Sequence, residues 1–162
     1  MSTCSYIWHK ISEHLTNDRV FSETYQHAMF LLDQYRGTIL SCRYAIPARL
    51  ALVESRTQLE KVVKVAVVDT IVRHPMLQVG MIDATAKFPS WIQLRSLDLK
   101  RHVNWLYLED QANFEEATQD IFRDQLDNEV PVLSAEQPGW KVTVIRQGNA
   151  PVLEILLTWN HP

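Results

Sequence analysis

The chain has 162 residues, of which 46% are hydrophobic and 22% charged, and these are the values of a single globular domain with one core. A net charge of -3 and 16 scattered lysines and arginines give no broad basic surface, so nucleic acid is not an expected partner. Two cysteines without CxxC spacing exclude a disulfide framework, and the absence of a long apolar stretch or an export signal predicts a cytoplasmic protein without a membrane span.

The N-terminal part of the sequence divides into an unassigned segment and the first elements of a domain. Residues 1–21 show weak periodicity, so the domain is predicted over residues 22–162. Residues 22–35 have apolar side chains at helical spacings, and Gly37 follows as a stop signal. Residues 38–46 favour a strand that Pro47 closes.

The clearest periodic segment begins at Thr57. Thr57 and Glu60 have the Thr-x-x-Glu form of a capping box, and apolar residues then recur at spacings of three and four. Further valines make the helix apolar on nearly every side, which predicts a buried crossover helix. Pro75 is expected to end it, and His74 beside that proline is interpreted as structural.

Short strands and one more helix follow. Strands are predicted over residues 77–82, 90–94 and 103–108. Residues 113–126 favour a helix with Asn113 as its cap and two glutamates in its first turn. Residues 140–145 and 152–159 predict two strands of an antiparallel hairpin. The expected fold class is therefore α/β (α+β), with a mixed sheet and flanking helices.

The last strand runs directly into Asn160, His161 and Pro162. A neutral imidazole at the end of a buried strand is held by a rigid scaffold, so His161 is the candidate general base. Asn160 is a candidate for orienting His161 or a substrate carbonyl, although a turn role is the stronger interpretation. Trp159 is a candidate substrate contact, against the commoner role of a core aromatic.

Other chemical signatures are missing from the sequence. No metal site is expected, because the histidines show no HExxH or comparable spacing. No GxSxG, GxxxxGK or GxGxxG motif is present, so no bound cofactor is expected either. The acidic residues near the helix over 113–126 are interpreted as a solvated face.

Several of these residues together carry a resemblance. A His74-Pro75-Met-Leu run ends an apolar helix, a Trp-x-Val strand begins at Trp140, and a leucine-rich strand ends in Trp159-Asn-His-Pro162. This pattern resembles the N-terminal half of the coenzyme A-dependent acyltransferase superfamily, whose signature is His-His-x-x-x-Asp-Gly. Within it the chain looks most like the fungal alcohol acetyltransferases, which are relatives of chloramphenicol acetyltransferase.

The resemblance implies an activity and assigns roles to the last residues. His161 stands at the catalytic histidine of the signature, and Asn160 stands where the family has its first histidine. The implied enzyme is an O-acyltransferase that moves an acetyl group from acetyl-CoA, a co-substrate, to a small alcohol in fungal secondary metabolism. The sequence stops at Pro162, before the Asp-Gly positions, so an N-terminal subdomain of the chloramphenicol acetyltransferase-like fold is expected, with the C-terminal subdomain absent.

Two alternatives stay open. The first is a non-catalytic truncated or split half-domain that binds a partner, either a complementary C-terminal half or a second copy of itself. Such a half is expected to expose an apolar face and to self-associate. The second is half of a peptide-synthetase condensation domain, which ranks lower because Asn160 replaces the first of the usual paired histidines.

Overall fold

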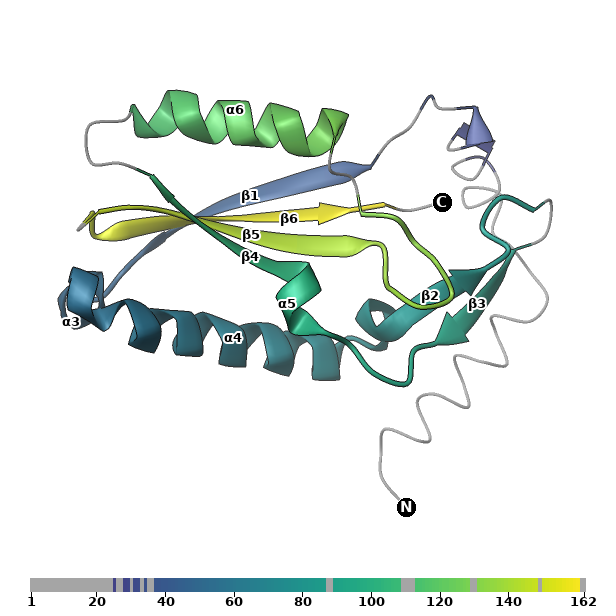
Figure 1. Cartoon of the computed structure of the whole chain (residues 1–162), viewed down its shortest axis with the longest axis horizontal. Helices are drawn as coiled ribbons and strands as arrows, with labels where there is room; N and C mark the ends of the chain where they lie inside the picture. Colours follow the sequence, from purple (N-terminus) through teal and green to yellow (C-terminus); the bar gives the residue numbers. More distant parts are fainter. Residues whose placement is uncertain are drawn as a thin grey trace, which may run out of the picture.

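The chain folds into three layers, in which a sheet lies between two long helices on its opposite faces (Figure 1). The computed structural model describes residues 25, 28–29, 31–32, 34, 37–86, 89–108, 113–128, 131–148 and 150–160. The strands are β1 (Thr38–Ala45), β2 (Val79–Ile82), β3 (Ser90–Gln93), β4 (Val103–Leu108), β5 (Trp140–Gln147) and β6 (Val152–Trp159). The helices are α3 (Ala48–Ala51), η1 (Val53–Ser55), α4 (Arg56–Arg73), η2 (Pro75–Gln78), α5 (Leu99–His102) and α6 (Phe114–Asp127).

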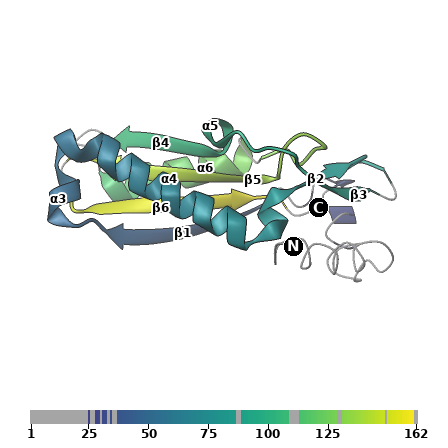
Figure 2. The same cartoon turned by 90° about the horizontal axis from the view of Figure 1, so that it is seen from below.

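The main sheet has the strand order β1-β6-β5-β4, which can be followed from below in Figure 2. Strand β6 pairs antiparallel with both β1 and β5, whereas β4 pairs parallel with β5, so the predicted mixed sheet with flanking helices is confirmed. The turn between β5 and β6 marks one end of this sheet, called here the hairpin end. At the other end, the exit end, β6 finishes at Trp159 while β1, β4 and β5 begin.

The main core lies between the sheet and α4. Alternate residues of β5 and β6 point toward this helix, because successive side chains of a strand face opposite sides. They meet Leu59, Val63 and Ile71 of α4, each at most 7% exposed, and burying each such side chain contributes about 1.5–3 kcal/mol. The strand residues of this core include Trp140, Val142, Val144, Leu153, Ile155, Leu157 and Trp159.

The start of α4 differs from the sequence prediction. The helix begins at Arg56, its N-cap is Ser55 without a side-chain cap bond, and the predicted capping box of Thr57 and Glu60 does not form. Glu60 instead accepts hydrogen bonds from the Tyr107 hydroxyl of β4 at 2.7 Å and from Arg56 Nε at 3.1 Å. The Glu60 side chain thus bonds to Tyr107 of the sheet instead of to the backbone at the start of its own helix.

The expectation that α4 is buried all round is wrong. Its outer face carries valines that remain exposed, with Val62 at 51%, Val65 at 61% and Val72 at 60%. Only one face of the helix lies on the sheet, and no other described residue is buried against the outer one. The apolar composition was therefore misread as burial, because a sequence does not show how many layers cover a helix.

Helix α6 covers the opposite face of the sheet near β1 and β6 (Figure 1). The predicted cap is confirmed, since the Asn113 side chain accepts from the N–H of Glu116. The apolar residues of α6 are only half-buried, whereas Gln125, 3% exposed, is fully buried against the sheet. Its amide joins two strands by donating to Thr143 at 2.7 Å and accepting from Thr158 at 2.8 Å.

Strands β2 and β3 form a separate antiparallel pair near the exit end (Figure 2). The strand predicted over residues 77–82 is shorter, because η2 occupies its beginning. Met81 donates to the carbonyl of Ser134 at 2.9 Å, and a Cβ on Gly80 would overlap that carbonyl oxygen. Gly80 is thus required for β2 to lie against the segment before β5.

The remaining differences concern short elements and the N-terminal region. The short helices α3, η1 and α5 have too few residues for a periodic signal and were not predicted. Most of the helix predicted over residues 22–35 lies outside the described residues, although Tyr25, Ala28, Met29 and Leu31 are helical.

Candidate functional site at the exit end of the sheet

The exit end holds Asn160, the last residue that the structure describes. Its backbone N–H donates to the carbonyl of Gly139 at 2.7 Å, so the chain stays fixed just after β6. A Cβ on Gly139 would lie 3.0 Å from the Asn160 carbonyl oxygen, which makes glycine important for this close approach. Asn160 is 8% exposed, and its side-chain Oδ1 has no hydrogen-bond partner among the described residues. A buried polar atom without a partner is costly in a purely structural position and is therefore a candidate ligand contact.

The two tryptophans at this end lie opposite each other in the β5–β6 pair. Trp140 is 4% exposed and donates from Nε1 to the carbonyl of Leu77 at 2.8 Å. Trp159 is partly buried and packs on the α4 side of the sheet with the main core. Because strand residues alternate, Asn160 belongs to the opposite, α6 side. Trp159 and Asn160, the two described residues that the sequence offered as substrate contacts, therefore lie on opposite faces of the sheet.

A pocket of about 200 Å³ opens at the same end, beside β4 and β5. It is lined by Arg101, His102, Asn104, Pro131, Gln137, Pro138, Trp140 and Lys141. Val103 pairs with Val142, so the last residues of α5 lie level with the first residues of β5. Pro138 and Trp140 flank Gly139, to which Asn160 is bonded, so pocket and Asn160 are separated by a single strand.

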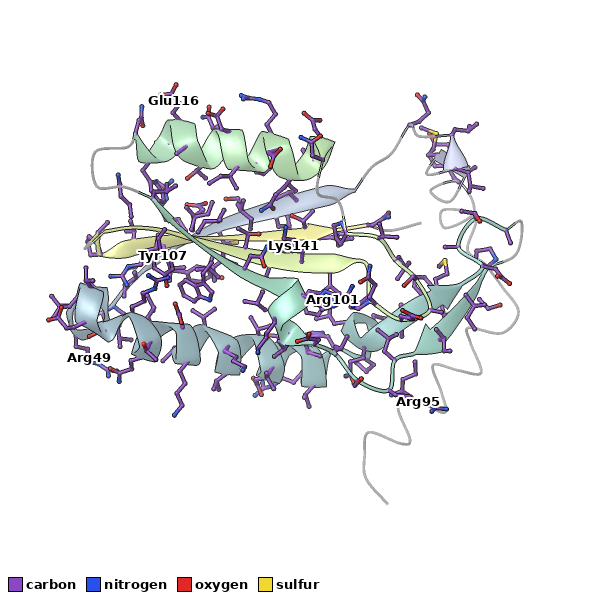
Figure 3. All side chains as sticks on the ribbon, in the orientation of Figure 1. Arg49, Arg95, Arg101, Tyr107, Glu116 and Lys141 are labelled. Atoms are coloured by element: carbon purple, nitrogen blue, oxygen red, sulfur yellow. The ribbon has the colours of Figure 1, made fainter. Side chains whose placement is uncertain are left out.

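The lining of the pocket is basic. Arg101 of α5 and Lys141 of β5 bring two cations to it (Figure 3), and none of the described carboxylates belongs to the lining. His102 is 6% exposed, and its Nδ1 lies 3.0 Å from the carbonyl of Trp140. Since a carbonyl only accepts, Nδ1 carries the proton, and this bond fixes the ring orientation. The ring also lies 5.0 Å from that of Trp140, centroid to centroid.

The hairpin end of the same sheet is organised by carboxylates. Arg43 of β1 bonds Glu154 of β6 at 2.8 Å and Glu115 of α6 at 2.7 Å, which ties the edge strand to its neighbour and to the helix. The hydroxyl of Ser41 donates to the same buried Glu154 carboxylate. On the other face, Arg146 is 1% exposed and donates to the carbonyl of Ala51 at the end of α3.

These contacts shift the pKa values of the groups involved. Burial and then the hydrogen bond to Glu60 raise the pKa of Tyr107 to about 12. The bond from Tyr107 and the nearby Arg56 lower the pKa of Glu60, although its burial acts in the other direction. The guanidinium of Arg43 likewise lowers the pKa of Glu115. The fold thus stabilises the charged carboxylates of Glu60 and Glu115 and the neutral phenol of Tyr107.

Of the predicted site residues, Asn160 and Trp159 lie at the exit end, and His161 lies outside the described residues. The pocket residues Arg101, His102 and Lys141 were not identified from the sequence as a site. The sequence does contain the basic run Lys100-Arg-His102 directly before a predicted strand, which could have indicated a cationic site. The parallel pairing of β4 with β5, which brings Lys141 beside this run, was not visible in the sequence. Within the described ranges there is no cluster of metal-ligand side chains, and no helix is long and apolar enough to cross a membrane.

No protein-family model and no curated protein matches the sequence. Among solved structures, the chain is similar to a variant of the starter condensation domain of the rhizomide synthetase RzmA, with a TM-score of 0.58 and 14% identity over 86% of this chain and 30% of that one. It is also similar to the wax ester synthase/diacylglycerol acyltransferase from Marinobacter aquaeolei VT8, with a TM-score of 0.55 and 15% identity over 83% and 31%. AB3403, a four-domain nonribosomal peptide synthetase, matches with a TM-score of 0.52 and 13% identity over 91% of this chain and 11% of that one.

These likenesses concern the fold alone, because the identities are low. The chain spans about a third or less of the length of the structures that it matches. The chain therefore shares the fold of one part of that starter condensation domain and of that wax ester synthase.

Proposed function

We propose that the chain carries the histidine half of an acyltransferase site, with His161 as the general base for transfer of an acetyl group from acetyl-CoA to a small alcohol. The observation that supports it most directly is the fixed exit of β6, where Asn160 is buried and bonded to Gly139 immediately before His161. The fold likeness to a condensation domain and to a wax ester synthase adds support for acyl transfer in general.

The proposed chemistry needs one proton acceptor. The neutral imidazole of His161 takes the proton of the alcohol hydroxyl while the oxygen attacks the thioester carbonyl carbon. The C–S bond then breaks, coenzyme A leaves as a thiolate, and the imidazolium returns the proton to it. General-base catalysis of this kind contributes about 10²–10⁴-fold in rate.

Asn160 is proposed to orient the reacting groups. Its Oδ1, which has no partner among the residues that the structure describes, is a hydrogen-bond acceptor held in a buried position, one residue before the proposed base. In this role it accepts from the imidazole N–H or from the substrate. Because a displacement of about 1 Å can cost about a hundredfold in rate, a fixed neighbour of the base matters as much as its basicity. Trp159 is assigned to the core rather than to the substrate, since it packs with the main cluster.

The test is release of thiol from acetyl-CoA by the purified chain in the presence of a panel of short alcohols. Release is expected with the wild-type chain, and His161→Ala is expected to lower it at least about a hundredfold. His74→Ala is the matched control, because His74 is exposed beyond the end of α4 and is expected to leave the rate unchanged. A wild-type chain that releases no thiol with any alcohol contradicts an autonomous transferase.

A second candidate is a non-catalytic half that associates with a second copy of itself. The observation that favours it is the row of exposed valines on α4, which gives the predicted apolar face. Sedimentation over a range of concentrations tests it, with Val65→Gln and Val72→Gln expected to shift the chain toward monomer. A wild-type chain that stays monomeric at high concentration contradicts this function.

A further inference from the structure

Strand β1 lies at one margin of the main sheet, and among the described residues it pairs with a strand on one side only (Figure 2). Its residues 40–45 are all exposed, whereas every residue of β5 and β6 is buried or half-buried. At the opposite margin, β4 is half-buried throughout except at Leu106. The more exposed of the two margins is therefore β1.

The pairing of β1 with β6 shows which of its backbone groups face outward. In an antiparallel pair, residues whose N–H and C=O point to the partner strand alternate with residues whose groups point away. Ile46, directly after β1, donates its N–H to the carbonyl of Pro151 at 2.7 Å, on the β6 side. Even-numbered positions thus bond to β6, and the groups that face outward belong to Ile39, Ser41, Arg43 and Ala45. Such a row of donors and acceptors is a template for another strand.

Strand β1 also lacks the features that usually protect an edge. Natural edge strands are kept short, carry Lys or Pro, or are interrupted by a bulge. In contrast, β1 has 8 residues in continuous register with β6, contains no Lys or Pro, and is about 27 Å long at about 3.4 Å per residue. Its single charged side chain, Arg43, pairs with Glu154 at 2.8 Å and with Glu115 at 2.7 Å in the same chain. No unpaired charge on β1 therefore repels an approaching strand.

We propose that β1 pairs antiparallel with β1 of a second copy of this chain, about a two-fold axis at Cys42. In this register Leu40, 52% exposed, lies opposite Tyr44 of the second copy, 51% exposed. Ser41 lies opposite Arg43, and both have backbone groups that face outward, so they exchange hydrogen bonds. No two like charges meet across the new pair, and the strand is complementary to itself.

A second copy suits this edge because a two-fold axis makes each favourable contact twice. Leu40 and Tyr44 face the α4 side of the sheet, since their neighbours in β6, Leu157 and Leu153, belong to the α4 core. The two four-stranded sheets become one continuous sheet, with α4 of both copies on the same face. The half-exposed side chains of β1 then form one apolar strip between the two helices. This pairing depends neither on acyl transfer nor on the outer valines of α4.

Cys42 reports on the register, because it is an exposed free thiol at the proposed axis. Even-numbered positions are non-hydrogen-bonded in the new pair, where opposite Cα atoms lie about 4.5 Å apart. A disulfide needs a Cα separation of about 4.4–6.8 Å. Oxidation with Cu²⁺-phenanthroline is therefore expected to link two chains, as two thiols lose two protons and pass two electrons to two Cu²⁺ ions. The experiment uses Cys4→Ser, and Cys42→Ser is the control that should link more slowly.

Sedimentation of the reduced full chain over a range of concentrations measures the association itself. Cys42→Lys places two like charges opposite each other at the axis and is expected to weaken the dimer at least about tenfold, whereas Cys42→Ser keeps it. A mixture of Cys42→Lys and Cys42→Glu is expected to restore a mixed dimer. Gln93→Lys is the matched control, since Gln93 is an exposed strand residue of β3. Urea denaturation of each variant checks that the monomer still folds.

The outcomes separate this proposal from the functions considered above. Loss of the dimer in Cys42→Lys, its recovery in the mixture and linkage through Cys42 support the pairing even if no thiol is released from acetyl-CoA. A dimer that Val65→Gln and Val72→Gln dissociate, and that Cys42→Lys leaves intact, forms through α4 and overturns the proposal. A chain that stays monomeric, or equal effects of Cys42→Lys and Gln93→Lys, overturns it as well.

Discussion

The two ends of the main sheet are built from different interactions. At the hairpin end, buried or half-buried charges have partners, as in the contacts of Arg43 with Glu154 and of Tyr107 with Glu60. At the exit end, the Oδ1 of Asn160 has no partner among the described residues, and Arg101 and Lys141 line the pocket beside it. The same strands thus end in a network of paired charges on one side, where of the buried charged groups only the Nε of Arg146 lacks a partner among the described residues, and in a buried amide oxygen without such a partner on the other.

This difference indicates where the fold is stabilised and where it is available for a ligand. A buried polar group without a partner costs about 1–3 kcal/mol, so it persists in a stable fold mainly where something other than stability requires it. The exit end is instead held by close backbone contacts, through Gly80 against Ser134 and Gly139 against Asn160. Such contacts fix the chain through its backbone rather than through its polar side chains.

The largest expected effect tests these backbone contacts. Gly80→Ala forces a Cβ onto the Ser134 carbonyl oxygen, and we expect a loss of about 3 kcal/mol in the free energy of unfolding, measured by urea denaturation. Gly139→Ala meets its neighbours at 3.0 Å and is expected to cost about 1 kcal/mol. Equal stability of Gly80→Ala and the wild type would show that the exit end is loosely packed.

A smaller effect compares one polar group from each end. Glu154→Ala removes the carboxylate that binds Ser41 and Arg43, so we expect a loss of about 2 kcal/mol in the free energy of unfolding. Asn160→Ala removes an oxygen that has no partner in the described part of the chain, and its expected cost is below about 0.5 kcal/mol. If the two variants lose the same stability in parallel urea titrations, the contrast between the ends does not hold.

The smallest expected effect is the pH dependence of the hairpin end. The pKa of Tyr107 is raised from 10.0 to about 12, so its contribution is complete below pH 10 and is lost as the pH rises toward 12. The pKa of Glu60 is lowered, so its contribution is present above 4.5 and is lost as the pH falls below that value. Thermal unfolding midpoints across the pH range measure both limbs.

The control for this prediction is Tyr107→Phe. This variant removes the hydroxyl that titrates and is expected to flatten the alkaline limb, while the acidic limb keeps the part that Arg56 contributes. Tyrosinate absorbance in the ultraviolet follows the same group directly. An alkaline limb that is identical in the variant and the wild type would mean that Tyr107 does not titrate as stated.

The strands and the long helices were predictable because their signals are local. Alternation over residues 152–159 and the turn before it gave both strands of the hairpin, and Asn113 marked the start of α6. The capping box at Thr57 failed because Glu60 has a stronger partner in Tyr107, 47 positions away. Exposure of the α4 valines was misjudged for a related reason, since burial depends on layers that are distant in sequence.

By itself, the sequence determined the mixed α/β fold class, the strand that leads to Asn160 and the candidate base that follows it, because periodicity, caps and turns act over a few residues. Only the tertiary structure showed that the Gly139 carbonyl binds the N–H of Asn160 and that Arg101 and Lys141 line one pocket. It also showed that Arg43 pairs with Glu115 and Glu154, so these charges hold strands and helix together. Each of these depends on which strands become neighbours, and strand order is set by the packing of the whole chain.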